Sequence, residues 1–123
     1  MLQKTEKLPL VYACSGCSNN AQLANQVALQ MDREQRAEMS CIAGVGGNVP
    51  SMVKKAKSGR KIIALDGCKL HCVKGCLANH QVDANVHLTL TDLGLKKRVK
   101  TEFNHEDVEL VQTRVWAHPS LKN

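Results

Sequence analysis

The chain has 123 residues, of which 43% are apolar, so a single domain over residues 1–123 can bury a hydrophobic core of its own. Aromatic residues make up only 2% against a net charge of +6, which disfavours nucleic-acid binding, because single-strand readers stack bases on aromatic side chains. No apolar run reaches the ~20 residues that span a bilayer, and residues 1–10 lack the apolar segment of a signal peptide, so we expect a cytoplasmic protein that stays out of the membrane.

The first half of the chain alternates strand and helix patterns. Residues 8–13 (LPLVYA) predict a short strand, and the turn CSGCS then leads into a helix from Asn19 to Arg36 with apolar residues at helical spacing. Residues 37–47 (AEMSCIAGVGG) predict a second strand that closes with a tight glycine turn. A second helix follows from about Val49, and Gly59 suits its end.

The second half repeats this alternation. The third strand is predicted from Lys61 to Leu65, because a nearly continuous apolar run is typical of a strand that is covered on both faces. We then expect a helix over residues 69–79, a fourth strand over residues 86–91 and a last helix that Asn104 caps and that runs to about Ala117.

This order of elements predicts an α/β fold with three layers. The expected centre is an open, mainly parallel four-stranded sheet, with helices on both faces and the first strand in the middle. Right-handed crossovers place every strand-to-helix turn at the same edge, the carboxyl edge of the sheet. Open α/β folds bind their ligands at that edge, so functional residues are expected there.

The cysteines follow the predicted strands. Cys14 and Cys17 lie in the turn after the first strand, Cys41 lies near the end of the second, and Cys68 and Cys72 come after the third. We therefore expect these five thiols to meet at the carboxyl edge. Because cytosolic thiols are kept reduced, metal binding or redox chemistry is expected of them before structural disulfides.

Two pairs of cysteines have the spacing of metal ligands. Cys14 and Cys17 form a C-x-x-C turn, and Cys68 and Cys72, four residues apart, are expected to present both sulfurs on one helical face. Four thiolates suit a tetrahedral zinc ion, and the nearby helix N-termini favour thiolates. Asp66 is expected either to cap the third helix or to orient the ligands from behind.

Packing competes with ligation at the remaining positions. Cys41 lies in an apolar segment, where burial explains it as well as ligation does. Cys76 lies two turns into the third helix, which favours packing. His71 is the histidine nearest to the cysteines, and its place on the predicted helix indicates an exposed side chain that points away from them.

Several segments together resemble the DGC-domain family of small bacterial proteins, which are described as zinc-binding. They are CSGCS at 14–18, MSCIAGVGG at 39–47, ALDGCKLHC at 64–72, and LTDLG at 90–94 followed shortly by KKR. The resemblance covers most of the chain and implies that the shared cysteines are Cys14, Cys41, Cys68 and Cys72. Cys17 and Cys76 match positions that vary more in the family. The family has no settled reaction, so the resemblance implies a site and no activity.

Three functions remain open at this point. The first is a protein that holds zinc through cysteine thiolates at the carboxyl edge, with a metal ion as its partner. The second is a thiol redox protein or sensor that uses Cys14/Cys17 and Cys68/Cys72. The third, less favoured, is a carrier of an iron–sulfur cluster or a soft metalloid, because six thiols exceed the needs of one zinc ion. Whether the protein is an enzyme stays open, as do its oligomeric state and its physiological partners.

Overall fold

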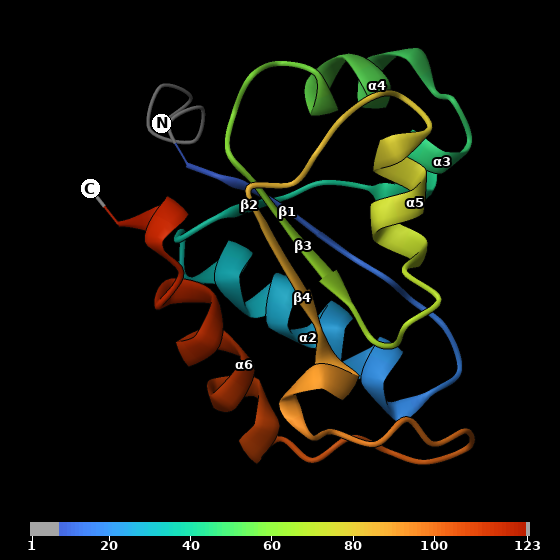
Figure 1. Ribbon diagram of the computed structural model, residues 1–123, viewed down its shortest axis with the longest axis vertical. Helices are drawn as coiled ribbons and strands as arrows, with labels where there is room; N and C mark the ends of the chain where they lie inside the picture. The colour runs from blue at the N-terminus through green and yellow to red at the C-terminus, as the bar shows by residue number, and fades with distance from the viewer. Residues whose placement is uncertain (1–7, 123) are drawn as a thin grey trace.

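A four-stranded parallel sheet forms the middle of the protein (Figure 1). The computed structural model describes residues 8–122. In sheet order the strands are β2 (Glu38–Met39), β1 (Leu10–Ala13), β3 (Ile62–Asp66) and β4 (Val86–Thr89), and every neighbouring pair is parallel. The predicted α/β class and the internal position of the first strand are confirmed.

Helices cover both faces of the sheet, as predicted. In Figure 1, α2 (Asn19–Arg33) and α6 (Glu106–Trp116) lie on one face, and α3 (Ile42–Gly46), α4 (Pro50–Ala56) and α5 (Cys72–Ala78) lie on the other. Two short 3-10 helices, Leu90–Leu93 and Pro119–Leu121, follow β4 and α6. No helix within residues 8–122 is both long enough and apolar enough to cross a membrane.

The alternation of side chains along β1 and β3 builds two separate cores. Val11 and Ile63 point into the layer formed with α2 and α6, and Tyr12 and Ala64 point into the layer formed with α3, α4 and α5. All four of these side chains are fully buried. Both faces of the central strands therefore exclude water, which explains why the sequence of β3 reads as an unbroken apolar run.

Helix α2 begins as the sequence indicates and ends earlier than predicted. The Ser18 hydroxyl accepts a hydrogen bond from the Ala21 amide at 3.1 Å and so caps the first turn. The helix stops at Arg33 rather than Arg36, because Gln35 takes a left-handed backbone conformation with φ of 58°.

The prediction of a strand over residues 37–47 is wrong in its second half. Strand β2 covers only Glu38–Met39, and Cys41 is the N-cap of α3 instead of the end of a strand. The Cys41 sulfur accepts a hydrogen bond from the Gly44 amide at 3.4 Å. A side chain at Gly44 would lie 2.5 Å from the Met52 side chain of α4, so this glycine allows the close approach of α3 and α4 and does not form a turn.

The prediction that a helix starts at Lys69 is also wrong, because α5 starts at Cys72. His71, just before it, is left-handed with φ of 54°, which breaks the helical path of residues 69–71. The last helix starts at Glu106, so the cap position is His105, one residue after the predicted Asn104, although the Asn104 side chain accepts from the Glu106 amide at 3.4 Å. Strand β4 ends at Thr89, where the Leu90–Leu93 helix takes over.

Candidate functional site

The structure places the five predicted ligands after the strands, at the carboxyl edge of the sheet. Cys14 directly follows β1, Cys68 follows β3 by two residues, and Cys72 opens α5. Cys41 precedes α3, and Cys17 lies in the turn before α2. Cys17, Cys41 and Cys72 are exposed, and Cys14 and Cys68 are half-buried. The exposure of Cys41 shows that the burial alternative for this residue is wrong.

Cys14 is the thiol most deeply set into the protein. Its sulfur accepts a hydrogen bond from the Gly67 amide at 3.1 Å, which joins the turn after β1 to the turn after β3. Burial raises the pKa of Cys14 to about 11, and the nearby charges of Asp66, Cys72 and Cys68 add to this rise against the opposing Gly67 bond. Cys14 is therefore a protonated thiol at neutral pH.

Cys68 has a cationic partner. The Lys97 ammonium donates a hydrogen bond to the Cys68 sulfur at 3.5 Å, across 29 residues of sequence. The contact places a positive charge directly beside a half-buried sulfur. The sequence contained no signal for this contact, because it depends on how the segment after β4 returns across the edge of the sheet.

Cys76 packs between helices, as predicted. An added side-chain atom at Gly46 of α3 would lie 2.9 Å from the Cys76 sulfur, so the sulfur fills the gap between α3 and α5. Burial raises the pKa of Cys76, and the charges of Cys72 and Asp66 add to the rise. Both effects keep Cys76 in its neutral form.

The expected pairing of Cys68 and Cys72 on one helical face is wrong, because residues 68–71 are not helical. Within residues 8–122, no three side chains of the metal-binding types lie close enough together, as positioned, to hold an ion. The thiols thus share one edge while they stand apart, and the charges of Cys72 and Cys68 add to the raised pKa of Cys14.

Asp66, the last residue of β3, caps α5, which is the helix that the sequence analysis expected it to cap. Its two carboxylate oxygens accept hydrogen bonds from the amides of Val73 at 2.8 Å and Lys74 at 3.2 Å, which fixes the first turn of α5. One of these oxygens also bonds Nε2 of His87 at 2.8 Å. The Asp66 side chain is 1% exposed, so the carboxylate is held from behind by three partners.

Two histidines to which the sequence analysis gave no role, His71 and His87, contact Thr89 and Asp66 at this edge. The rings of His71 and His87 meet edge to face, with their centroids 5.0 Å apart. His71 is half-buried and its Nε2 lies 3.1 Å from the hydroxyl oxygen of Thr89, so the expectation that it is exposed is wrong. The strand register that pairs Ala64 with His87 and Asp66 with Thr89 brings these groups together, and only the assembled sheet contains that information.

A segment after the Leu90–Leu93 helix crosses the carboxyl edge, and we name residues 95–100 the basic strap. The Asn20 side chain donates to the carbonyl of Leu95 at 2.7 Å and to the carbonyl of Gly67 at 3.1 Å, so it holds the strap beside the turn that carries Cys68. Asn19 exchanges backbone and side-chain hydrogen bonds with Arg98 and Lys96. The strap is therefore built onto the start of α2.

The fold and the thiol edge define a small cysteine-rich α/β protein. The chain belongs to the DGC domain family, which matches it over residues 10–115. The resemblance to this family noted from the sequence is thereby confirmed. It is 64% identical over 104 residues to the anaerobic and virulence modulator AnvM of Pseudomonas aeruginosa, an alignment that covers 85% of this chain and 79% of that protein. No solved structure matches the chain.

Proposed function

We propose that this protein binds a thiophilic metal ion, with zinc preferred, through the thiolates of the carboxyl edge. The observation that carries the proposal is that Cys14, Cys68 and Cys72 all lie just after β1 and β3, with the Cys14 sulfur hydrogen-bonded to the Gly67 amide next to Cys68. A divalent cation displaces the protons of the thiols that bind it and offsets the repulsion between the resulting thiolates.

The donor chemistry of this edge fits zinc. Cys14, Cys68 and Cys72 would provide three sulfur ligands, and the fourth would come from Cys17 or Cys41, both of which are exposed at the same edge. Binding requires these thiols to turn toward one another, and exposed side chains on turns do so without disturbing the core. Asp66 supports the arrangement by holding the start of α5, and with it Cys72, in place.

The metal would tie the turns of the edge together without being needed for the fold. Both buried layers of the sheet are built from apolar side chains, with Cys14 packed against both of them, so the core forms without an ion. Removal of the metal is expected to loosen the turns after β1 and β3 and to leave the helices intact. We place the protein in the cytoplasm, where thiols stay reduced and available.

The test is the metal content of protein purified without oxygen and under reducing conditions. We expect about one zinc ion per chain, and a strong loss in Cys68→Ser, because a closed site of four thiolates does not tolerate a missing ligand. Cys76→Ser is the matched control, since Cys76 packs against α3 and lies outside the proposed ligand set. Metal-free reduced protein, or equal loss in the two variants, would contradict the proposal.

A second candidate function, thiol redox chemistry, is favoured by the contact between Lys97 and Cys68. A half-exposed sulfur beside an ammonium is suited to attack disulfides or peroxides. The relative is named an anaerobic modulator, a description that concerns that protein and is compatible with oxidant-sensitive thiols here. The rate at which Cys68 is alkylated distinguishes the two functions. A chelator raises this rate if a metal ion covers the thiol, and leaves the rate unchanged if the thiol acts without a metal.

A further inference from the structure

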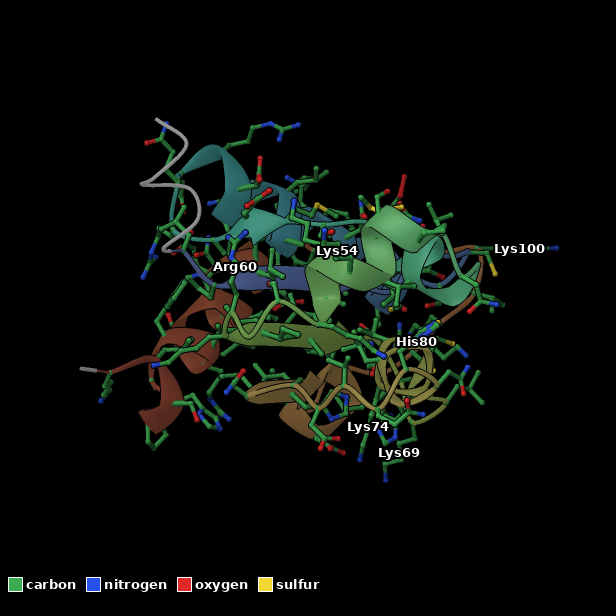
Figure 2. The ribbon with its side chains drawn as sticks, turned by 90° about the horizontal axis from the view of Figure 1, so that it is seen from above. Lys54, Arg60, Lys69, Lys74, His80 and Lys100 are labelled. Atoms are coloured by element: carbon green, nitrogen blue, oxygen red, sulfur yellow. The ribbon has the colours of Figure 1, made fainter. Side chains whose placement is uncertain are left out.

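The thiol edge is surrounded by positive charge. Two segments flank the Cys68 sulfur, residues 67–74 and 94–101, and neither contains an acidic residue. Together they carry six exposed cations, which we name the cationic rim: Lys69, Lys74, Lys96, Lys97, Arg98 and Lys100. Figure 2 shows Lys69 and Lys100 extending away from the ribbon. The Asn20 side chain binds both segments, so the rim is one surface and not two.

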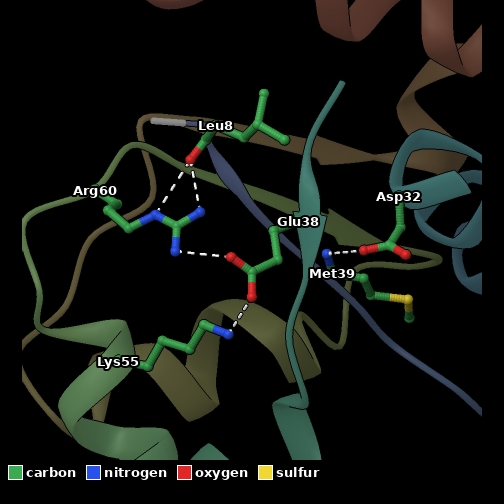
Figure 3. A network of polar contacts seen from close by, with 6 residues as sticks. All are labelled: Leu8, Asp32, Glu38, Met39, Lys55 and Arg60. Atoms are coloured by element: carbon green, nitrogen blue, oxygen red, sulfur yellow. Dashed lines mark hydrogen bonds and ion pairs between the residues drawn. The ribbon is translucent and has the colours of Figure 1, made fainter. Parts of the chain in front are cut away.

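The cations of the rim are not neutralised by acidic neighbours. Within residues 8–122, none of the six takes part in an ion pair. The contrast lies near the opposite end of the sheet, where the Glu38 carboxylate binds Lys55 and Arg60, the latter at 2.9 Å (Figure 3). Asp66, which directly precedes the first segment, is buried and already bound to His87 and two backbone amides. Glu102 follows the second segment and lines a hollow with Lys96 and Arg98 without an ion pair to either. The rim therefore presents a net positive charge to solvent.

The sulfur inside this rim is accessible to a small reagent. Cys68 is half-exposed and lies between its own turn and the basic strap, with Lys97 in contact with its sulfur. A surface that carries several cations concentrates small anions and raises the rate at which they arrive. Carboxylates carried by the incoming molecule would meet Lys97 and the exposed Lys69 next to Cys68 in the chain.

From this arrangement we infer that Cys68 undergoes reversible exchange with small disulfides that carry carboxylate groups. The inference rests on the proposed thiol site and names the reactant that its surroundings select. The Cys68 thiolate, whose proton has passed to water, attacks one sulfur of the disulfide RS–SR. The S–S bond of the reactant breaks, a new S–S bond joins Cys68 to R–S, and the leaving thiolate RS⁻ departs with the electron pair. Attack by a second RS⁻ on the mixed disulfide reverses the step.

The experiment compares three aliphatic disulfides on reduced, metal-free full-length protein: the dianionic 3,3′-dithiodipropionate, the neutral bis(2-hydroxyethyl) disulfide and the dicationic cystamine. Mass spectrometry identifies the cysteine that forms the mixed disulfide. The rate for each disulfide is divided by its rate with a small neutral reference thiol, which removes differences in intrinsic reactivity between the disulfides. We expect the dianion to exceed the dication about tenfold at an ionic strength of about 0.01 M, where charges act over about 30 Å. The preference shrinks to about twofold at about 1 M salt.

Two variants locate the effect. Lys97→Gln lowers the charge preference about threefold, because it removes the cation in contact with the sulfur. Lys57→Gln is the matched control: Lys57 follows α4 near the amino end of β3, so the same loss of charge there leaves the preference unchanged. Equal rates for dianion and dication, or labelling that maps to another cysteine, overturns the inference.

The result is independent of the outcome for metal binding. Wild-type protein that binds zinc but shows no charge preference overturns the exchange inference and leaves the proposed function standing. If protein purified without oxygen contains no metal but Cys68 keeps its charge preference, the proposed metal binding is overturned and the exchange inference stands.

Discussion

Gly67 separates the end of β3 from the first turn of α2 and leaves no room for a side chain. A Cβ atom at this position would lie 2.9 Å from the carbonyl carbon of Asn20 and 3.0 Å from the amide nitrogen of Ala21. Both are backbone atoms of a turn that Ser18 caps, so they cannot rotate away as the end of a flexible side chain would. Gly67→Ala is therefore expected to push β3 and α2 apart at the thiol edge.

The cost follows from two contributions. Overpacking a tight contact costs about 1–3 kcal/mol. Gly67 also donates to the Cys14 sulfur and accepts from the Asn20 side chain, both at 3.1 Å, and each weakened hydrogen bond adds about 0.5–1.5 kcal/mol. We expect the free energy of unfolding of Gly67→Ala to fall by about 3 kcal/mol, a large share of the total stability of a small domain.

Gly75 provides the matched control with the opposite sign. It lies inside α5, and nothing stands within 4 Å of a Cβ placed there. Gly75→Ala should raise the free energy of unfolding by about 0.5–1 kcal/mol, because alanine loses less backbone freedom than glycine when a helix forms. The same chemical change is thus predicted to destabilise at one position and to stabilise at the other.

The assay is urea unfolding of reduced protein, followed by helical circular dichroism and by the fluorescence of Trp116, the one tryptophan of the chain. Equal m-values for the variants will show that the unfolded states are comparable. If Gly67→Ala lies within about 0.5 kcal/mol of the wild type, the contact between the two turns is looser than these distances indicate, and the reasoning fails.

Three further predictions concern single groups. Asp66→Ala should lower the free energy of unfolding by about 2–3 kcal/mol and Asp66→Asn by less, because alanine leaves the buried amides at the start of α5 unpaired; urea unfolding measures both. Partial burial alone would raise the pKa of Glu38, but the hydrogen bonds from Lys55 and Arg60 outweigh it and hold the pKa below 4.5, so this contribution to stability is complete above that pH and is lost as the pH falls below it. Acid unfolding of Glu38→Gln should accordingly lack this loss, and an unchanged acid limb would refute the assignment. In metal-free protein, Cys14 should be alkylated more slowly than any exposed cysteine at neutral pH and should accelerate only as the pH approaches about 11, as mass spectrometry of labelled peptides will show.

The sequence alone was sufficient for the overall architecture and for the edge at which the cysteines lie. Apolar runs and helical spacing are local properties of the chain, and the alternation of strands with helices leaves a parallel sheet as the stable way to bury both patterns. Cys14, Cys41 and Cys68 each follow a strand, so a parallel sheet brings them to one edge whatever the details of packing. The Ser18 cap is equally local, because it joins a hydroxyl to an amide three residues ahead.

The second half of residues 37–47 was assigned to the wrong element, because short apolar runs do not distinguish a strand from a helix. CIAGVG fits either pattern, and the choice is made by contacts with distant residues: Val45 is fully buried on the sheet, and Gly44 lets Met52 of α4 approach. Such contacts outweigh the weak local preference of five or six residues for one backbone conformation.

The polar surroundings of the thiols were decided by tertiary structure. Asp66 binds amides seven and eight residues ahead, which moves the start of α5 to Cys72, and strand register brings His87 to the same carboxylate. Lys97 reaches Cys68 only because Asn20 holds the basic strap against the turn after β3. These are side-chain hydrogen bonds between segments up to 75 residues apart, and no periodicity of the sequence encodes them, since each depends on where the folded backbone places its partner.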